Sequence, residues 1–240
     1  MSTIIFTAGA KGGTGKSAAI RFLVTYLREQ GFNPLLLDMD DENHTLSRFF
    51  PEAQRVEIKK LSSNDVLVKT VLEGEELVIA DLKAGVGRGT LDWWLGLPFD
   101  KLSDIKFVCL ASITSSPDSV QSFFNWAAAL KNQVTYLICK NEKDGDICPD
   151  YEKSAEGIRF HESAENLHEV TIPLLEEYMP ELERLNLTIS EVIEANGQTK
   201  TSTGKEISLD LSCILVRARL EQYQERIYNQ LTPILNLLKE

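Results

Sequence analysis

One glycine-rich run near the start of the chain constrains the fold more than any other segment. Positions 9–17 read Gly-Ala-Lys-Gly-Gly-Thr-Gly-Lys-Ser, between an apolar stretch at 4–6 and a helix-like stretch at 18–30. The apolar stretch predicts a buried strand, and a glycine-rich turn between a strand and a helix is the setting of a phosphate-binding loop. Glycines let backbone N–H groups turn inward around an anion, and the helix N-terminus adds partial positive charge. The run therefore predicts a site for a phosphorylated ligand.

Two side chains of this loop are expected to add contacts to those of the backbone N–H groups. Lys16 reaches the β- and γ-phosphates of a nucleotide, and the Ser17 hydroxyl ligates Mg²⁺. The strict pattern G-x-x-x-x-G-K-[ST] is not met, because Ala10 replaces its first glycine, and a second lysine, Lys11, opens the loop. A glycine-rich turn with two surface lysines is the alternative interpretation. The expected nucleotide-binding residues of the loop are Lys11, Gly12, Gly13, Thr14, Gly15, Lys16, Ser17 and Ala18.

Two apolar stretches farther along the chain both end in carboxylates. The stretch at 34–37 leads to Asp38 and Asp40, and the stretch at 76–80 leads to Asp81. In a doubly wound sheet, ligands bind at the carboxyl ends of the strands, so we expect Asp38 and Asp40 to face the ligand of the phosphate loop. A solvated turn at the strand end is the alternative for the acids that follow Asp40. The glycine-rich loop and the two carboxylate-ended strands together indicate a nucleotide site more specifically than any one of them alone.

The string Lys-Gly-Gly-x-Gly-Lys-Ser resembles the deviant Walker A motif of the MinD/ParA family of ATPases, which implies ATP and Mg²⁺ as ligands. The resemblance implies that Lys11 crosses a dimer interface to the partner's nucleotide. It also implies that Asp40 lies near Mg²⁺ and the attacking water, with Asp38 in support. Asp81 resembles the Walker B aspartate that holds Mg²⁺, and Gly85 would lie in the switch loop, near the γ-phosphate.

The resemblance covers positions 2–141 well, and several positions depart from it. Asp41-Glu42 stands where the family often has Pro-Gln, and Lys83-Ala84 replaces the prolines that usually follow the Walker B aspartate. Asn141 follows an apolar strand, where family members carry an asparagine that hydrogen-bonds adenine. An ordinary polar turn residue is an equal alternative for Asn141. Pro173 matches a proline that ends a late strand beside the base.

The order of elements predicts an α/β fold with one domain over residues 1–240, a P-loop NTPase with a mostly parallel sheet flanked by helices. Further strands are predicted at 105–110, 134–139 and 169–173, and a helix at 118–130. Residues 154–166 fit no single element. We expect a flexible loop at 197–205 and a mainly helical segment at 209–238, interrupted or kinked near Pro233.

Composition limits the classes of function. No apolar run reaches about 18 residues, so no transmembrane helix is expected. The chain starts directly with a strand and has no signal-like segment, so a cytoplasmic protein is expected. Four cysteines without a Cys-x-x-Cys pair signal neither a zinc nor a redox motif. A net charge of −11 opposes strong nonspecific DNA binding, which rests on neutralising phosphates.

The resemblance implies an ATP-dependent homodimer that hydrolyses ATP slowly and moves or positions a plasmid, chromosome or other cargo. A conjugation or plasmid-maintenance ATPase and a small-molecule ligase remain alternatives. A protein partner is expected, with exposed contacts at Trp93 or Trp94 and along the stripe Leu231, Ile234 and Leu235. Weak DNA contact would use Arg217, Arg219 and Arg226, although a solvated mixed-charge face is the favoured interpretation of these arginines.

Overall fold

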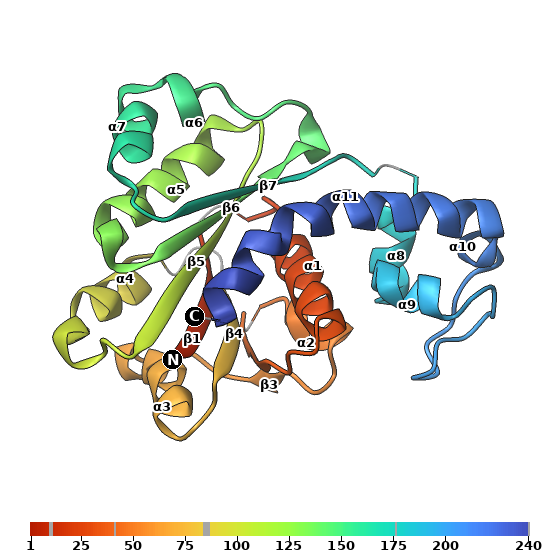
Figure 1. Cartoon of the computed structure of the whole chain (residues 1–240), viewed down its shortest axis with the longest axis horizontal. Helices are drawn as coiled ribbons and strands as arrows, with labels where there is room; N and C mark the ends of the chain where they lie inside the picture. Colours follow the sequence, from red (N-terminus) through yellow and green to blue (C-terminus); the bar gives the residue numbers. More distant parts are fainter. Residues whose placement is uncertain (10–11, 41, 84–86, 176, 240) are drawn as a thin grey trace.

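The computed structural model describes residues 1–9, 12–40, 42–83, 87–175 and 177–239, with the side chains at 87 and 88 left out. In this part of the chain one parallel sheet of seven strands has the order β3-β2-β4-β1-β5-β6-β7 (Figure 1). The predicted α/β class with a parallel, helix-flanked sheet is confirmed. The strands are β1 (Ser2–Ala8), β2 (Leu35–Met39), β3 (Gln54–Arg55), β4 (Leu77–Leu82), β5 (Ile105–Ile113), β6 (Thr135–Asn141) and β7 (Leu167–Ile172).

Helices cover both faces of the sheet (Figure 1). The longer ones are α1 (Lys16–Glu29), α3 (Val66–Leu72), α4 (Gly87–Leu95), α5 (Pro117–Leu130), α7 (Ala155–Ser163), α8 (Met179–Leu185) and α11 (Ile214–Lys239). The shorter ones are α2 (Thr45–Phe49), α6 (Asp150–Lys153), α9 (Ile189–Glu194), α10 (Leu209–Ser212) and four 3₁₀ turns, η1 (Leu61–Asp65), η2 (Phe99–Lys101), η3 (Lys131–Gln133) and η4 (Glu142–Asp144).

The central strand β1 divides the interior into two apolar cores. Ile4 and Phe6 belong to the core that α3, α4 and α5 cover, and Ile5 belongs to the core beneath α1, α2 and α11. Side chains alternate between the faces of a strand, and a parallel sheet covered on both faces needs apolar residues on each side. This is why the apolar stretch at 4–6 is continuous.

The register of the strands brings the predicted motifs to one edge of the sheet. Asp38 of β2 lies opposite Asp81 of β4. On the other side of β4, Phe6 of β1 lies opposite Ala80, so the end of β1 leads into the glycine-rich loop beside both carboxylates. Asn141 of β6 lies opposite Ile172 of β7 at the same edge. The parallel topology, rather than closeness in sequence, assembles the site.

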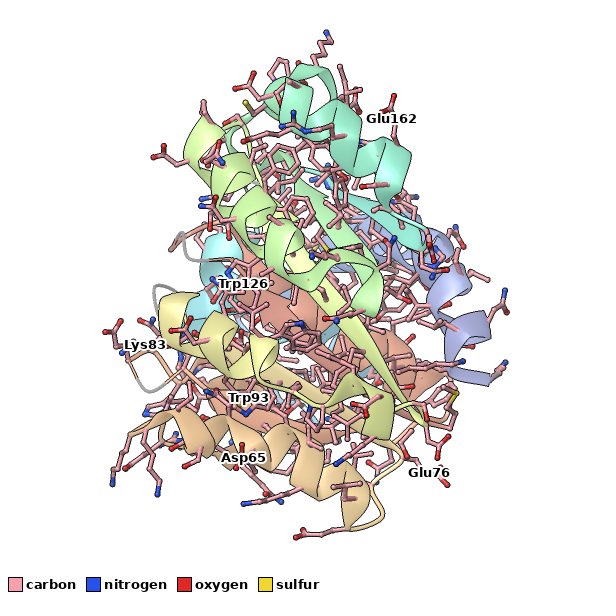
Figure 2. All side chains as sticks on the ribbon, turned by 90° about the vertical axis from the view of Figure 1, so that its left-hand side faces the viewer. Asp65, Glu76, Lys83, Trp93, Trp126 and Glu162 are labelled. Carbon is pink, nitrogen blue, oxygen red and sulfur yellow. The ribbon has the colours of Figure 1, made fainter. Side chains whose placement is uncertain are left out.

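Both tryptophans of α4 are buried, which corrects the expectation that one of them is exposed. Trp93 donates its indole N–H to Asp65 Oδ1 (2.9 Å), and Figure 2 shows these two residues beside each other. Trp94 packs among Phe6, Phe99 and Phe107. The helix lies between η1 on one side and α5 on the other, so two of its faces are covered. Neither tryptophan is available as an exposed partner contact.

The last helix also differs from the expectation. Residues 214–239 form one helix with Pro233 inside it, so of the two outcomes expected there, an interruption or a kink, the interruption does not occur. Proline offers no N–H to the carbonyl of Asn229, and the Thr232 hydroxyl donates to that carbonyl instead (3.4 Å). The apolar stripe of this helix is buried in the core with α1 and is not an exposed partner surface; it comprises Leu231, Ile234 and Leu235.

The structure is definite in two segments that the sequence left unassigned or predicted to be flexible. Most of the ambiguous stretch at 154–166 is helix α7, which begins at the Ser154 cap. The loop at 197–205 is fixed at its end, where Lys205 Nζ donates to the carbonyls of Phe49 (2.9 Å) and Asn186 (3.0 Å). None of the helices within the described residues combines the length and apolar character that crossing a membrane requires.

Candidate functional site

A cleft of about 590 Å³ opens at the carboxyl ends of the strands, where the register brings the motifs together. Most of the predicted site residues line it, although their roles stay predictions. Lys11 and Gly85 lie outside the described residues, and Asp38 lies behind the cleft wall. The predicted residues that line the cleft are Gly12, Gly13, Thr14, Gly15, Lys16, Ser17, Ala18, Asp40, Asp81, Asn141 and Pro173.

The glycine-rich loop turns tightly before α1. Gly13 and Gly15 have φ angles of 74° and 91°, in the left-handed region that glycine adopts at little cost. Helix α1 then begins at Lys16 without a side-chain cap and without an acidic residue in its first turn. The first N–H groups of a helix have no partner inside it, and they carry partial positive charge. The N-terminus of α1 is therefore uncapped at the cleft and suits an anion.

Lys16 is a buried cation between carboxylates. Its side chain lines the cleft, yet the residue is only 8% exposed. Burial lowers the pKa of this ammonium group, and the charges of Asp81 and Asp40 act in the opposite direction. A phosphate group in the cleft would add further negative charge beside Lys16 and stabilise its charged form.

Asp81 is held by residues from two other motifs. The Thr7 hydroxyl donates to Asp81 Oδ1 (3.0 Å) and accepts from the Leu82 N–H (2.7 Å). Ser17 Oγ donates to Asp81 Oδ2 (3.3 Å). Burial raises the pKa of Asp81 to about 6, although the bond from Thr7 and the charge of Lys16 pull it down. Thr7 was not predicted, since a threonine inside an apolar strand carries no motif.

The donor set fits a magnesium ion. Mg²⁺ prefers oxygen ligands and binds through one or two carboxylates, waters and substrate phosphates. Ser17 Oγ and Asp81 Oδ2 lie within hydrogen-bond distance of each other beside the cleft, with Asp40 on the same wall. No group of three metal-ligating side chains able to hold an ion by itself occurs among the described residues. Such an arrangement suits a metal that arrives with phosphates.

The two carboxylates at the end of β2 have different surroundings, since Asp38 is buried in the protein and Asp40 lines the cleft. Asp38 is fully buried and accepts from the N–H groups of Ser47 (2.8 Å) and Asp40 (3.3 Å), so it ties the loop to α2 instead of facing the ligand. Asp40 lines the cleft, and its Oδ1 accepts from the N–H groups of Glu42 (3.1 Å) and Asn43 (3.2 Å). The local turn fixes the Asp40 carboxylate.

Asn141 braces the glycine-rich loop. Its Nδ2 donates to the carbonyl of Thr14 (3.0 Å), which also accepts from Ser112 Oγ (2.7 Å). Its Oδ1 accepts from the Lys143 N–H (3.2 Å). Two of its hydrogen-bonding groups are thus engaged within the protein. These bonds support a structural role for Asn141. Its predicted contact with adenine stays a prediction.

The two loops that flank the cleft are tied to each other. Lys83 Nζ lies 2.9 Å from Glu42 Oε1, so the residue after β4 pairs with the loop after β2. Figure 2 shows Lys83 at the outer edge of the molecule. Each residue belongs to one of the two segments that depart from the family pattern, Asp41-Glu42 and Lys83-Ala84. The ion pair therefore links the two departures to each other.

Sequence reasoning missed the wall of the cleft that lies opposite the loop. Tyr223 of α11 donates its hydroxyl to the carbonyl of Pro173 (2.7 Å). Arg48 donates to Asn186 Oδ1 (2.9 Å), which joins α2 to the C-terminus of α8. Tyr223, Arg48 and Asn186 lie in no recognisable motif, and the fold brings them from distant segments. The unpredicted lining includes Asn43, Thr45, Arg48, Lys143, Ile172, Leu174, Leu175, Met179, Pro180, Glu183 and Tyr223.

Comparisons with known proteins agree with this geometry. The chain matches the family described as the CobQ/CobB/MinD/ParA nucleotide binding domain over residues 5–195. No curated protein sequence matches it. A chain of the MinC:MinD cell division protein complex of Aquifex aeolicus is similar in structure, with 13% identity, a TM-score of 0.53, and 95% of this chain and 96% of that chain covered.

Two further solved structures share the fold. The cell division ATPase MinD of Pyrococcus furiosus has 15% identity and a TM-score of 0.53, with 95% of this chain and 99% of that chain covered. Apo McdA of Cyanthece has 13% identity and a TM-score of 0.51, with 94% and 99% covered. At such identities the likeness concerns the fold alone.

Proposed function

The chain belongs to the CobQ/CobB/MinD/ParA nucleotide-binding family, and we propose that it is an ATPase of the MinD/ParA type that switches between monomer and dimer. One observation carries the proposal. The uncapped N-terminus of α1, the buried Lys16 and the pair Ser17–Asp81 converge on one cleft. This arrangement supplies N–H donors, a cation and a Mg²⁺ site for a triphosphate.

In this proposal, catalysis is mainly positioning and charge neutralisation, as in other phosphate-loop ATPases. The loop over 12–17 and Lys16 hold the phosphates, and Ser17 and Asp81 hold Mg²⁺. Asp40, which lines the same cleft, orients the attacking water. The apolar wall around Pro173 and Tyr223 takes the base. The whole chain then acts as one ATPase domain over residues 1–240.

Dimerisation follows from the second lysine. Lys11 opens the loop beside Gly12 and Gly13, where it adds a cation that a single phosphate site does not need. Two subunits facing each other would place four lysines around two triphosphates, and this charge density favours ATP over ADP. Slow hydrolysis then releases the dimer. Gly85, four residues after Asp81 in the sequence, would sense the γ-phosphate.

The cellular role proposed for the switch is partition or positioning of a cargo through a protein partner. One of the similar structures is a complex of MinC with MinD. DNA contact would be weak and would need the ATP dimer, since the net charge is −11. The arginines considered for it are partly engaged: Arg217 bonds Asn196 (2.7 Å) and Arg219 bonds Tyr178 (2.9 Å). In this proposal the protein and its partner act in the cytoplasm.

Titration with a fluorescent ATP analogue and Mg²⁺ tests the nucleotide function. Lys16→Ala should abolish saturable binding, whereas Lys153→Ala, an exposed lysine on α6, should bind as the parent does. Asp40→Ala should bind the analogue and hydrolyse ATP on the order of 100-fold more slowly, because the attacking water loses its orientation. Unchanged binding by Lys16→Ala, or hydrolysis at the parental rate by Asp40→Ala, contradicts the proposed roles.

A further inference from the structure

The turn that follows β2 is folded around the carboxylate of Asp40. Its Oδ1 accepts from the N–H groups of Glu42 (3.1 Å) and Asn43 (3.2 Å), and its Oδ2 accepts from Asn43 Nδ2 (3.2 Å). The carbonyl of Asp40 accepts from the N–H of His44 (3.0 Å), a residue whose φ angle of 47° lies in the left-handed region. The direction in which the carboxylate points therefore depends on where residues 42–44 lie.

Two neighbouring elements hold this turn. On the side of α2, the buried carboxylate of Asp38 accepts from the N–H of Ser47 (2.8 Å), so the far end of the turn is fixed to β2. On the side of β4, Lys83 Nζ lies 2.9 Å from Glu42 Oε1. Lys83 follows Asp81 by two residues in the sequence. The ion pair thus ties the turn to the strand that carries the carboxylate of the proposed Mg²⁺ site.

The register of the sheet places this ion pair next to Asp40. Met39 lies opposite Leu82 in the last registered pair of β2 and β4, so Asp40 and Lys83 are the next residues along the two segments. The side chain of Lys83 is only 22% exposed, and a largely buried ammonium group is costly unless a carboxylate pairs with it. Glu42 supplies a carboxylate, which gives the pair more weight than a pair of fully exposed side chains has.

We propose that Lys83 is a positioning residue for ATP hydrolysis, because its pairing with Glu42 fixes the direction of the Asp40 carboxylate. The inference rests on the proposed function, in which Asp40 orients the attacking water. Asp40 lines the cleft and Lys83 does not, so the effect of Lys83 on the water passes through the turn. A small displacement of a group that orients a reactant costs much of the rate. Loss of the pair therefore slows hydrolysis and leaves nucleotide binding intact.

Steady-state hydrolysis of ATP by the full chain with Mg²⁺ measures this effect. Lys83→Gln and Glu42→Gln should each lower kcat roughly tenfold and leave KM unchanged, because the turn moves while the loop that holds the phosphates stays in place. The double variant should lose no more than either single variant, since both residues act through one contact. Lys83→Arg keeps a cation beside Glu42 and should retain the parental kcat.

Two controls locate the effect. Lys83→Gln should cause no further loss in an Asp40→Ala background, because the carboxylate that it positions is already gone. Lys59→Gln removes the cation of an exposed ion pair with Glu57, outside the cleft, and should hydrolyse ATP as the parent does. An unchanged kcat in Lys83→Gln, losses that multiply in the double variant, an equal loss in Lys59→Gln, or a loss that persists without Asp40 would each overturn the proposal.

Amide NMR signals of the protein without nucleotide separate this inference from the proposed function. Lys83→Gln should shift the signals of Glu42 and Asn43, whose N–H groups donate to Asp40, and Lys59→Gln should leave them in place. If the signals shift but the parent hydrolyses no ATP, the proposed function is wrong and the tie from Lys83 to Asp40 stands. If the parent hydrolyses ATP and the signals do not shift, the tie is wrong and the proposed function stands.

Discussion

Substitution of Gly15 by alanine probes how the glycine-rich loop is braced. A Cβ atom at this position would lie 2.0 Å from Asn141 Nδ2 and 3.2 Å from Asn141 Cγ. The Asn141 amide would have to move, and its bond to the Thr14 carbonyl would be lost. The φ angle of 91° adds a second cost, because an L side chain is strained in the left-handed region.

The magnitude follows from these two contributions. The left-handed conformation costs alanine about 1–2 kcal/mol. Loss of the Asn141–Thr14 bond costs about 1 kcal/mol, since the Thr14 carbonyl keeps its bond from Ser112. Gly15→Ala should therefore lower the free energy of unfolding by about 2–3 kcal/mol in the parent. In an Asn141→Ala background the space is open and the bond is already lost, so about 1–2 kcal/mol should remain.

The assay is urea unfolding of the parent, both single variants and the double variant, without nucleotide. A coupling of about 1 kcal/mol between the two positions is expected from the shared contact. Equal costs of Gly15→Ala in both backgrounds would refute the reasoning, because the strain of the backbone alone would then explain the loss. The Gly15→Ala variant should also bind ATP more weakly than the parent, since the loop that holds the phosphates is displaced.

Two further predictions concern Asp81. Its folded pKa of about 6 exceeds the ordinary 3.8, so the folded state binds more protons in this interval, and the stability of the nucleotide-free protein should fall by about 3 kcal/mol as the pH rises from 4 to above 6. Urea unfolding of Asp81→Asn should lack this decline; the same decline in both proteins would contradict it. Thr7→Val should raise the Mg²⁺ concentration needed for ATP binding roughly tenfold, because the carboxylate loses its orienting hydroxyl, and Thr7→Ser should restore it. Equal Mg²⁺ dependence in Thr7→Val and the parent would show that Thr7 has no such role.

The parts of the site that the sequence predicted are local in the chain. A phosphate loop needs its glycines, its lysine and its serine within nine residues, and Asp81 directly follows an apolar strand. The same patterns predicted the parallel sheet, because apolar stretches alternate with helix-like ones. The topology then places Ser17 beside Asp81 without any further signal in the sequence.

The parts that failed depend on what packs against each element. Adjacent residues of a helix face different directions, which suggested one exposed tryptophan, yet α4 has neighbours on two sides and buries both. Asn141 was weighed as a base contact or a turn residue; its Oδ1 accepts from the Lys143 N–H in a turn, and the base contact stays a prediction. Arg48 and Tyr223 reach the cleft from segments far apart in sequence, which no local pattern reports.

The molar mass of the protein with and without nucleotide tests the central claim most directly. Light scattering should give a monomer without nucleotide and with ADP, and twice that mass with Mg²⁺ and ATP. Lys11→Ala should bind ATP but stay a monomer, because the lysine that crosses the interface is gone. A parent that stays monomeric when saturated with ATP, or a Lys11→Ala variant that dimerises as the parent does, would contradict the ATP-driven dimer switch.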